Sequence, residues 1–313
     1  MTIAFIFPGQ GSQAVGMGRG LAGAFSTARL LFEEIDDALN QNLSRIMFEG
    51  PDDDLRLTEN AQPALMTTSM AIIRVLQEEG GVEIDNVAAF VAGHSLGEYT
   101  ALAAAGSIGL IDAARLLKLR GQSMQKAVPV GEGAMTALLG LEFDVACEVA
   151  SEAAQGEVCD PANDNGPGQV VLSGATAAIE RAMEIAKEKG ARRAIPLPVS
   201  APFHCAMMAP AAEVMAQALD ETDIQAPCVP LVANVSAASA IDPPIIRRLL
   251  VEQVTKIVRW RECVGYMKDS GVDTLIEIGA GKVLSGLTRR IDRDLSARSV
   301  QSPADIEALL KDL

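Results

Sequence analysis

The chain has 313 residues, which is long enough for about two domains of ordinary size, or for one large body that carries an insertion. Hydrophobic residues make up 49% of it and charged residues 21%, a composition that excludes an intrinsically disordered chain. The 26 Lys and Arg residues against 41 Asp and Glu give a net charge of −15, and only 4% of the residues are aromatic, so nucleic acid is not expected as a partner.

Short apolar runs alternate with helical patterns in the first and last parts of the chain. Residues 3–7 are all apolar and are followed by Pro8-Gly9, which predicts a short buried strand. Apolar spacing of the same kinds predicts helices at 26–40 and 63–79, a strand at 87–92, helices at 96–105 and 112–126, a strand at 274–278 and a helix at 282–292. This alternation favours an α/β fold with a mainly parallel sheet that helices cover on both faces.

The middle of the chain has a different order of elements. The patterns predict a strand at 136–141, a helix at 143–154, strands at 157–160 and 169–173, a helix at 175–189 and a strand at 193–197. This βαββαβ order is the ferredoxin-like pattern. Linker-like prolines flank it, so we predict a subdomain at 128–198 inserted into a body formed by 1–127 and 199–313.

Neither a membrane segment nor a secretion signal is expected. The longest uncharged window, 194–212, contains four prolines, which a spanning helix does not tolerate, and no basic segment precedes the uncharged residues 2–18. Five cysteines form an odd set without a CxxC pair, and the chain has only two histidines. We therefore expect a cytoplasmic protein with no disulfide framework, no metal site and no cofactor.

Residues 93–97, Gly-His-Ser-Leu-Gly, match the G-x-S-x-G pattern of a nucleophile elbow where a predicted strand meets a predicted helix. The sharp turn strains the serine, so its neighbours two residues away must lack bulk. In such a turn the amide of Leu96 points toward a developing oxyanion. Ser95 is therefore a candidate nucleophile, and the alternative is a glycine-rich turn with a capping serine.

A serine hydroxyl is a weak nucleophile that needs a base, and the chain offers two histidines. His94 adjoins Ser95, and neighbouring side chains on a turn project apart, so His94 is poorly placed as that base. His204 lies just after Pro202, in the segment where the chain leaves the predicted subdomain. A lone histidine is more often structural, but His204 is the candidate base if Ser95 is the nucleophile.

Arg120 falls in the middle of the apolar face of the predicted helix 112–126, when residues are placed about 100° apart. A buried guanidinium needs an anion, because an unpaired charge in an apolar interior costs several kcal/mol. Two partners remain open from physical reasoning alone. One is an internal Asp or Glu, and the other is a substrate carboxylate, which the planar guanidinium binds through two hydrogen bonds.

A glycine-rich segment at 9–14 follows the first strand and fits the loose G-x-G-x-x-A dinucleotide pattern. That interpretation requires a second strand that ends in an acidic residue, whereas 26–40 is predicted to be helical. Gln10 is better interpreted as a polar group at the C-terminal end of a strand, where the active sites of α/β sheets collect.

Several motifs occur together in one order along essentially the whole chain. Phe-Pro-Gly-Gln-Gly-Ser-Gln stands at 7–13 and Gly-His-Ser-Leu-Gly-Glu-Tyr at 93–99. They are followed by Arg120-Gly121, Asn163-x-Asn165, Gly168-Gln169-Val170, Pro202-Phe203-His204 and Val251-Glu252-Gln253. This combination resembles the malonyl-CoA:acyl carrier protein transacylase family, with the first two motifs similar to its N-terminal signature and its nucleophile motif.

The resemblance implies an α/β-hydrolase-like body with a ferredoxin-like insertion and an active site in the cleft between them. It implies that Ser95 is the nucleophile, that His204 is the base, and that Gln10 and the Leu96 amide form the oxyanion hole. A backbone carbonyl near Gln253, rather than an aspartate, is expected to orient the histidine. The residues expected to bind substrate are Arg120, which grips the malonyl carboxylate, and His94, Phe203, Asn163, Gln169 and Gln253.

The implied reaction is a two-step (ping-pong) transfer that serves fatty acid synthesis. Malonyl-CoA acylates the serine, and the ester then passes its malonyl group to the phosphopantetheine thiol of a holo acyl carrier protein. Such carriers are acidic, as this chain is, so docking needs a local basic patch. The candidates are 247–298, with 11 basic against seven acidic residues, and the basic cluster at 187–193. We expect a monomer.

Two other functions remain open at this point. A serine hydrolase needs the same serine and histidine and an acidic third residue between them in the chain. Asp144, Asp160 and Asp164 lie in that interval, but inside the predicted insertion. A non-catalytic scaffold that binds acyl carrier protein keeps the site only in vestigial form.

Overall fold

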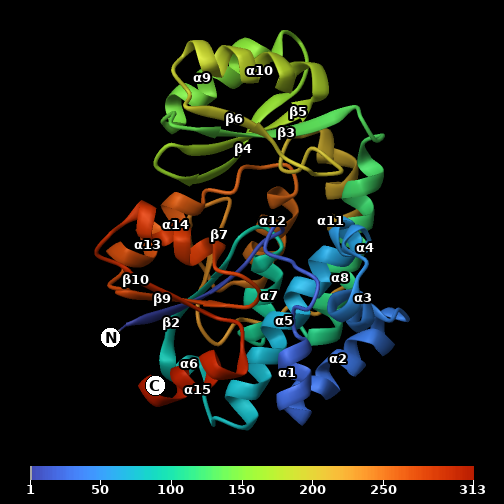
Figure 1. The fold of residues 1–313 in the computed structure, drawn as a ribbon, viewed down its shortest axis with the longest axis vertical. Helices are drawn as coiled ribbons and strands as arrows, with labels where there is room; N and C mark the ends of the chain where they lie inside the picture. Colours follow the sequence, from blue (N-terminus) through green and yellow to red (C-terminus); the bar gives the residue numbers. More distant parts are fainter. Residues whose placement is uncertain (1) are drawn as a thin grey trace.

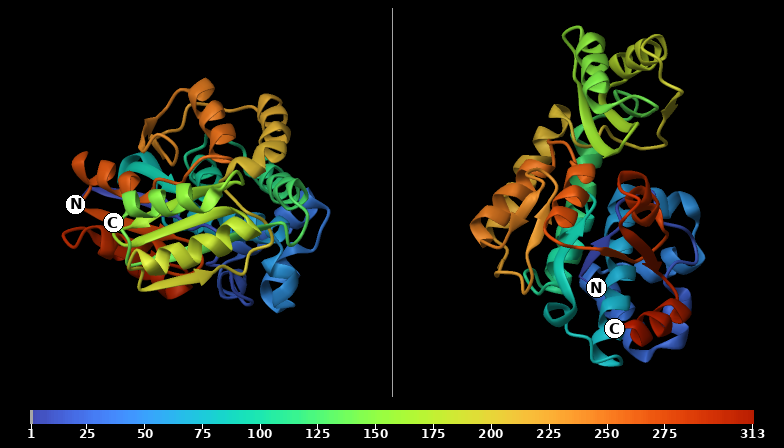
Figure 2. Two further views of the ribbon diagram at one scale, coloured as in Figure 1. Left: turned by 90° about the horizontal axis from the view of Figure 1, so that it is seen from above. Right: turned by 90° about the vertical axis from the view of Figure 1, so that its left-hand side faces the viewer.

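Two separate β-sheets organise the chain in the computed structural model, which describes residues 2–313 (Figure 1). The larger sheet has six strands in the order β10 (Ser296–Val300), β9 (Thr274–Ile278), β1 (Ile3–Phe7), β2 (Ala88–Gly93), β7 (Leu231–Ala233) and β8 (Ala238–Ala240). The smaller sheet has four, in the order β4 (Cys159–Gly166), β5 (Gln169–Ala175), β3 (Gly133–Leu139) and β6 (Arg193–Pro196). The small sheet and its helices form a distinct unit at one end of the molecule, which the right-hand view of Figure 2 shows most clearly.

The larger sheet is mainly parallel, which confirms the fold class that the sequence predicted. Its central strand β1 pairs in parallel with β2 on one side and with β9 on the other, and among the described strands only β7 and β8 pair antiparallel in this sheet. Alternate side chains of β1 enter different apolar clusters, Phe5 and Phe7 the larger one and Ala4 and Ile6 the smaller one. Because both faces are covered, β1 is a continuous apolar run.

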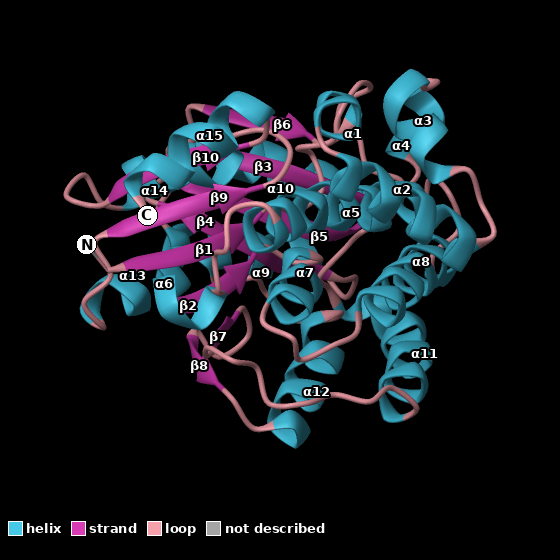
Figure 3. Ribbon diagram, turned by 90° about the horizontal axis from the view of Figure 1, so that it is seen from below, coloured by secondary structure: helices cyan, strands magenta, loops and turns pink. Residues whose placement is uncertain are grey.

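Helices cover both faces of this sheet (Figure 3). The larger cluster includes α5, α7 and α8, and the smaller includes α13 and α14. The helices of the body are α1 (Arg19–Ala24), α2 (Ser26–Leu39), α3 (Leu43–Glu49), α4 (Asp52–Arg56), α5 (Thr58–Glu78), α6 (Ile84–Val87), α7 (Gly97–Ala104), α8 (Leu110–Ala127), α11 (Ala209–Asp220), α12 (Pro243–Gln253), α13 (Trp260–Asp269), α14 (Val283–Ile291) and α15 (Pro303–Asp312).

Helix α5 begins earlier than its sequence pattern predicted. The spacing of apolar residues predicted a helix from 63, but α5 begins at Thr58 and Pro63 lies inside it. The added turn contains Asn60 and Gln62, which are buried although polar. Gln62 is held by hydrogen bonds to Thr58 and, across the site, to Arg120, so tertiary contacts rather than local propensity extend the helix.

The small sheet has the element order that the sequence predicted, β3, α9 (Phe143–Ala154), β4, β5, α10 (Thr176–Glu188) and β6. Its strands all pair antiparallel, and its own apolar cluster joins the sheet to α9 and α10. Strand β4 extends well past the predicted 157–160, to Gly166. Its later residues are poor strand formers, Asp, Pro and Asn among them, and pairing with β5 holds them extended.

Residues 199–273, to which the sequence patterns assign no element, form a short 3₁₀ turn (Ala206–Met208), α11, the edge strands β7 and β8 of the larger sheet, α12 and α13. Three of the expected site residues, Phe203, His204 and Gln253, lie in this stretch. Within residues 2–313, no helix is both long enough and apolar enough to cross a membrane.

Candidate active site

Ser95 stands on the sharp turn between β2 and α7, with a positive φ of 54°. The glycines of the motif leave no room for a side chain at either flank. A Cβ on Gly93 would lie 1.9 Å from the carbonyl carbon of Gly97, and a Cβ on Gly97 would lie 2.4 Å from the carbonyl oxygen of Phe7. The turn therefore exists because both positions are glycine, and it holds the serine in the strained region typical of a functional residue.

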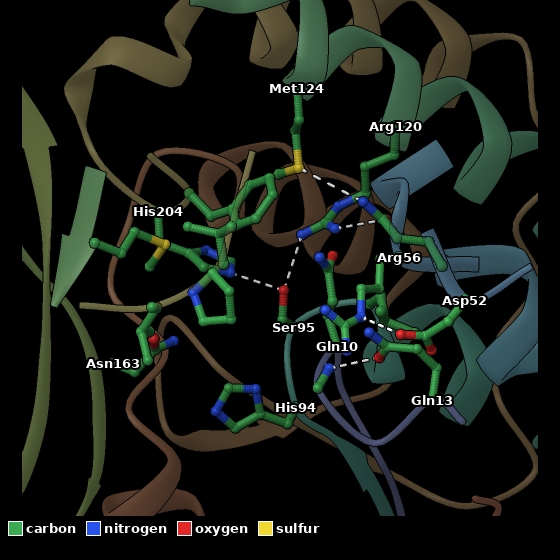
Figure 4. A pocket seen from close by; sticks show the side chains of 18 residues that line it. Gln10, Gln13, Asp52, Arg56, His94, Ser95, Arg120, Met124, Asn163 and His204 are labelled. Carbon is green, nitrogen blue, oxygen red and sulfur yellow. Dashed lines mark hydrogen bonds and ion pairs between the residues drawn. The ribbon is translucent and has the colours of Figure 1, made fainter. Parts of the chain in front are cut away.

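His204 contacts the serine hydroxyl directly. Its Nε2 lies 2.7 Å from Ser95 Oγ (Figure 4). Its Nδ1 lies 2.8 Å from the backbone carbonyl oxygen of Gln253. A carbonyl accepts only, so Nδ1 carries the proton and Nε2 presents a lone pair to the serine hydroxyl. Burial, and then the charge of Arg120, lower the pKa of His204 to about 3, which keeps the imidazole neutral and able to accept a proton.

Gln10 and Leu96 line the same cavity as the nucleophile, Gln10 from the loop after β1 and Leu96 from the residue before α7. The backbone N–H groups of both residues have no acceptor among residues 2–313. The side-chain oxygen of Gln10 accepts a hydrogen bond of 2.8 Å from Thr58 Oγ1, which anchors the loop. Two free backbone donors beside a serine are the arrangement that an oxyanion hole requires.

Arg120 lies in the same cavity and is almost fully buried, at 1% exposed. Its Nη1 donates to Gln62 Oε1 at 2.8 Å, and its Nη2 donates to Gln253 Oε1 at 2.8 Å and to Ser95 Oγ at 3.2 Å. All three acceptors are uncharged, and Nε has no acceptor within residues 2–313. The sequence left two partners open for this guanidinium, an internal Asp or Glu and a substrate carboxylate. Within residues 2–313, no Asp or Glu forms an ion pair with it.

The cavity around these groups holds about 350 Å³ and lies between the body and the inserted sheet. His94, Asn163 and Phe203 line it, as expected of substrate-binding residues. His94 also spans the two parts of the molecule, because its Nε2 lies 2.8 Å from Asn165 Oδ1 on β4. The apolar part of the lining comes from Leu96, Met124, Met135, Leu197, Val199 and Phe203.

Two expected substrate-binding residues do not line this cavity. Gln253 is fully buried and contacts Arg120 and the backbone carbonyl of Ser95. Gln169 lies elsewhere, on β5. Its Oε1 accepts a hydrogen bond of 2.9 Å from Arg290 Nη1, and it lines a second cavity of about 500 Å³. Arg192 and Arg193 line the same cavity. The two basic clusters that the sequence presented separately, near 187–193 and within 247–298, therefore meet at one place, because α14 contacts β4 across the boundary of the insertion.

Sequence reasoning missed two buried polar residues behind the nucleophile, Glu98 and Asn234. Asn234 Oδ1 accepts from the backbone N–H of Ser95 at 2.8 Å, and Glu98 Oε1 accepts from the backbone N–H of Asn234 at 2.7 Å. Burial raises the pKa of Glu98 to about 8, whereas its hydrogen bonds and the charge of Arg120 oppose that rise. Glu98 belongs to the matched motif, which was the available signal, but no local pattern marks Asn234.

Comparison with known proteins places this geometry in a family. The chain matches the model of the acyl transferase domain over residues 4–302. It is 46% identical over 312 residues to a malonyl CoA-acyl carrier protein transacylase of Bacillus subtilis, covering 99% of this chain and 97% of the relative. It superimposes with a TM-score of 0.97 on the crystal structure of an acyl-carrier-protein-S-malonyltransferase from Bartonella henselae, at 55% identity over 100% of this chain and 99% of that one.

A further similar structure holds a malonyl-transacylase together with the acyl-carrier protein of a type II polyketide synthase. It matches with a TM-score of 0.96 at 44% identity, and the match covers all of both chains. Full-length similarity at this level leaves no part of the catalytic cavity outside the match. The chain belongs to the family of malonyl CoA-acyl carrier protein transacylases, within the acyl transferases.

Proposed function

We propose that this protein transfers a malonyl group from malonyl-CoA to an acyl carrier protein, for fatty acid synthesis, through a malonyl ester of Ser95. The observation that carries the proposal is the surroundings of one oxygen atom. Ser95 Oγ lies 2.7 Å from a neutral imidazole nitrogen and 3.2 Å from a buried guanidinium nitrogen. One group accepts the serine proton, and the other attracts a substrate that ends in a carboxylate.

In the first half-reaction, Ser95 Oγ attacks the thioester carbonyl carbon of malonyl-CoA while His204 Nε2 accepts the hydroxyl proton. The N–H groups of Gln10 and Leu96 stabilise the oxyanion of the tetrahedral intermediate. The carbon–sulfur bond then breaks, and His204 returns the proton to the departing CoA thiolate. The product is a malonyl ester on the serine and free CoA.

The second half-reaction uses the same groups in the opposite direction. The phosphopantetheine thiol of the holo carrier protein gives its proton to His204 Nε2, and its sulfur attacks the ester carbonyl carbon. The carbon–oxygen bond to Ser95 breaks, and the proton passes from His204 to the serine oxygen. Transfer competes with hydrolysis, so the apolar wall that includes Phe203 and Met124 supports the reaction by limiting water near the ester.

Arg120 is the proposed partner of the malonyl carboxylate. Its Nε is buried without an acceptor and its Nη1 donates to Gln62 alone, so two of its five N–H groups remain for a carboxylate. An anion bound there also offsets the positive charge that lowers the pKa of His204. Binding of malonyl therefore strengthens the base that starts its own transfer.

A serine hydrolase is less well supported, because the group behind the histidine is a backbone carbonyl and not a carboxylate. Two of the acidic residues that the sequence offered for that role are engaged elsewhere. Asp160 accepts from the backbone N–H of Ala206, and Asp164 pairs with Arg261 at 2.8 Å. A neutral orienting group leaves the base without the ion-pair stabilisation that an acidic triad member supplies.

The carrier protein is proposed to dock on the second cavity, where Arg192, Arg193 and Arg290 are all exposed. The surface of an acidic carrier is complementary to this concentration of positive charge on an otherwise acidic protein. All the groups of the proposed mechanism come from one chain, so we propose that the monomer is sufficient for transfer.

Incubation with malonyl-CoA followed by intact-mass measurement tests the proposal. The wild-type protein is expected to gain the mass of one malonyl group, and S95A is expected to gain none. Addition of a holo acyl carrier protein should then remove the adduct and malonylate the carrier. Release of free malonate without an adduct would indicate a hydrolase, and no change in mass or in malonyl-CoA would indicate a scaffold.

A further inference from the structure

Glu98, the second residue of α7, is a buried carboxylate that the mechanism above does not use. It is 1% exposed, and its two oxygens accept from different donors. Oε1 accepts from the backbone N–H of Asn234, and Oε2 accepts from the side-chain Nε2 of Gln253. Burial of a carboxyl group costs free energy unless its oxygens are hydrogen-bonded. The carboxyl group of Glu98 is therefore suited to this place by its two acceptor oxygens.

The amide of Gln253 connects this carboxylate to the substrate-binding guanidinium. Its Nε2 donates to Glu98 and also to the backbone carbonyl oxygen of Ser95, at 2.9 Å. Its Oε1 accepts from Arg120 Nη2 at 2.8 Å. One amide therefore touches the carboxylate, the nucleophile turn and the arginine.

Only one orientation of this amide satisfies its neighbours. If the oxygen and nitrogen of the Gln253 amide exchanged places, the oxygen would face two acceptors, the Glu98 carboxylate and the Ser95 carbonyl. The NH₂ group would then face the N–H donors of Arg120, leaving both sides repulsive. Both oxygens of Glu98 face N–H donors, so the carboxyl group acts as an acceptor on each side and favours the orientation that presents the NH₂ group of Gln253 to it.

Glu98 reaches Arg120 only through the Gln253 amide. No ion pair joins the two groups within residues 2–313, because that amide lies between them. A direct ion pair would occupy the guanidinium edge that a substrate carboxylate needs. The arrangement holds the guanidinium in place and leaves its Nε without an acceptor.

We propose that Glu98 is a positioning residue for malonyl selectivity, which fixes the Gln253 amide so that its oxygen holds Arg120 ready for the carboxylate of the acyl group. This inference rests on the proposed malonyl transfer. It assigns to Glu98 no contact with substrate. Its effect is therefore expected on the choice of acyl group rather than on acylation in general.

The test compares single-turnover acylation of Ser95 by malonyl-CoA and by acetyl-CoA in the wild type and in E98Q. The amide introduced by E98Q offers one acceptor oxygen to two donors, so the Gln253 amide loses its fixed orientation. We expect the malonyl-to-acetyl rate ratio to fall by about ten- to a hundredfold, the range for a hydrogen bond to a charged group, with acetylation nearly unchanged. In an R120A background, E98Q should change the ratio no further, because its effect passes through the arginine.

E277Q is the matched control. Glu277, on β9, is also a fully buried glutamate whose two oxygens accept backbone N–H groups, those of Leu284 and Ser285, and it does not line the catalytic cavity. E277Q is expected to lower stability without changing the malonyl-to-acetyl ratio. If E98Q does not fold, E98D takes its place in the test. E98D keeps a carboxyl group with both oxygens but is one methylene shorter, so it should lose part of the malonyl selectivity.

An E98Q or E98D protein that loses malonyl and acetyl transfer equally, or that keeps the wild-type ratio, overturns the inference, since a merely structural role predicts that result. A further fall of the ratio in the R120A background overturns it as well. Failure of the proposed function is distinct, because there the wild-type protein itself acquires no malonyl group.

Discussion

The two cavities of this protein both contain arginines, but Arg120 of the catalytic cavity and the arginines of the second cavity have opposite surroundings. In the catalytic cavity, Arg120 is 1% exposed and is held by two amide oxygens and the nucleophile. In the second cavity, Arg192, Arg193 and Arg290 are exposed, and only Arg290 has a side-chain hydrogen bond, to Gln169, within residues 2–313. A buried charge interacts strongly at short range with one partner, whereas exposed charges act weakly and together.

The difference explains how one residue type suits the two tasks that we propose for it in one reaction. Burial removes the water that competes for Arg120, so a small carboxylate bound there gains most of the guanidinium's hydrogen-bonding capacity. The exposed arginines stay hydrated and screened by salt, which suits a protein partner that must dock and leave. The catalytic cavity is thus suited to select the acyl group, and the second cavity is suited to attract its acceptor.

The largest effect is expected from R120A. Loss of the buried guanidinium should remove about 2–5 kcal/mol of the preference for malonyl over acetyl groups, while acetyl transfer is retained or rises. Single-turnover acylation with both CoA thioesters measures this. R115A is the control, because Arg115 lies on the exposed face of the same helix. An unchanged malonyl preference in R120A would remove the distinction between the two cavities.

A pH effect of intermediate size is expected from His204, whose pKa burial and Arg120 lower to about 3. Between its usual pKa and about 3 the imidazole takes up a proton only in the unfolded state, so the wild type loses stability as the pH falls through this window. From about pH 7 to about pH 5, the unfolding free energy of the wild type should fall by about 2 kcal/mol more than that of H204Q.

Urea unfolding of both proteins across this range measures the difference. Because the comparison subtracts all other titrating groups, including His94, whose pKa burial also lowers, parallel pH curves for the two proteins would contradict a buried neutral imidazole at this position. That outcome would mean that the His204 imidazole is exposed to water, as the arginines of the second cavity are.

The smallest effect is expected from charge reversal in the second cavity. R192E combined with R290E should raise the apparent KM for a holo acyl carrier protein about three- to tenfold at low salt, with the effect shrinking as salt is added. Transfer of malonyl to Ser95 from malonyl-CoA should not change. R29E combined with R45E carries the same change of charge on α2 and α3, where both arginines are exposed. Equal KM values for the two double variants would exclude docking at the second cavity.

Much of the catalytic centre could be predicted from local patterns. The G-x-S-x-G spacing identified Ser95 because the turn demands glycine on both sides, as the contacts at Gly93 and Gly97 show. His204 followed from the need for a base and the scarcity of histidines, and its Nε2 does contact the serine. Arg120 stood out as a charge on an apolar helix face, and it is buried.

Other parts of the centre had no local signal. Asn234 follows a three-residue strand, β7, and nothing in its neighbours marks it as the acceptor for the amide of Ser95. Gln169 was expected to bind substrate because its motif, 168–170, resembles that of the family, yet it lines the second cavity and accepts a hydrogen bond from Arg290 on α14. Residues 199–273 gave no predicted element although they supply His204 and Gln253.

By itself, the sequence determined the alternation of strands and helices, the order of elements in the inserted subdomain and the candidates for the reacting groups, because periodicity, turn chemistry and scarce residue types are local properties. The tertiary structure decided which oxygen orients His204, which uncharged groups hold Arg120, and where the two basic clusters meet. These contacts join residues 49 to 133 positions apart, and only the packing of sheet, helices and insertion brings such distant groups within hydrogen-bonding distance.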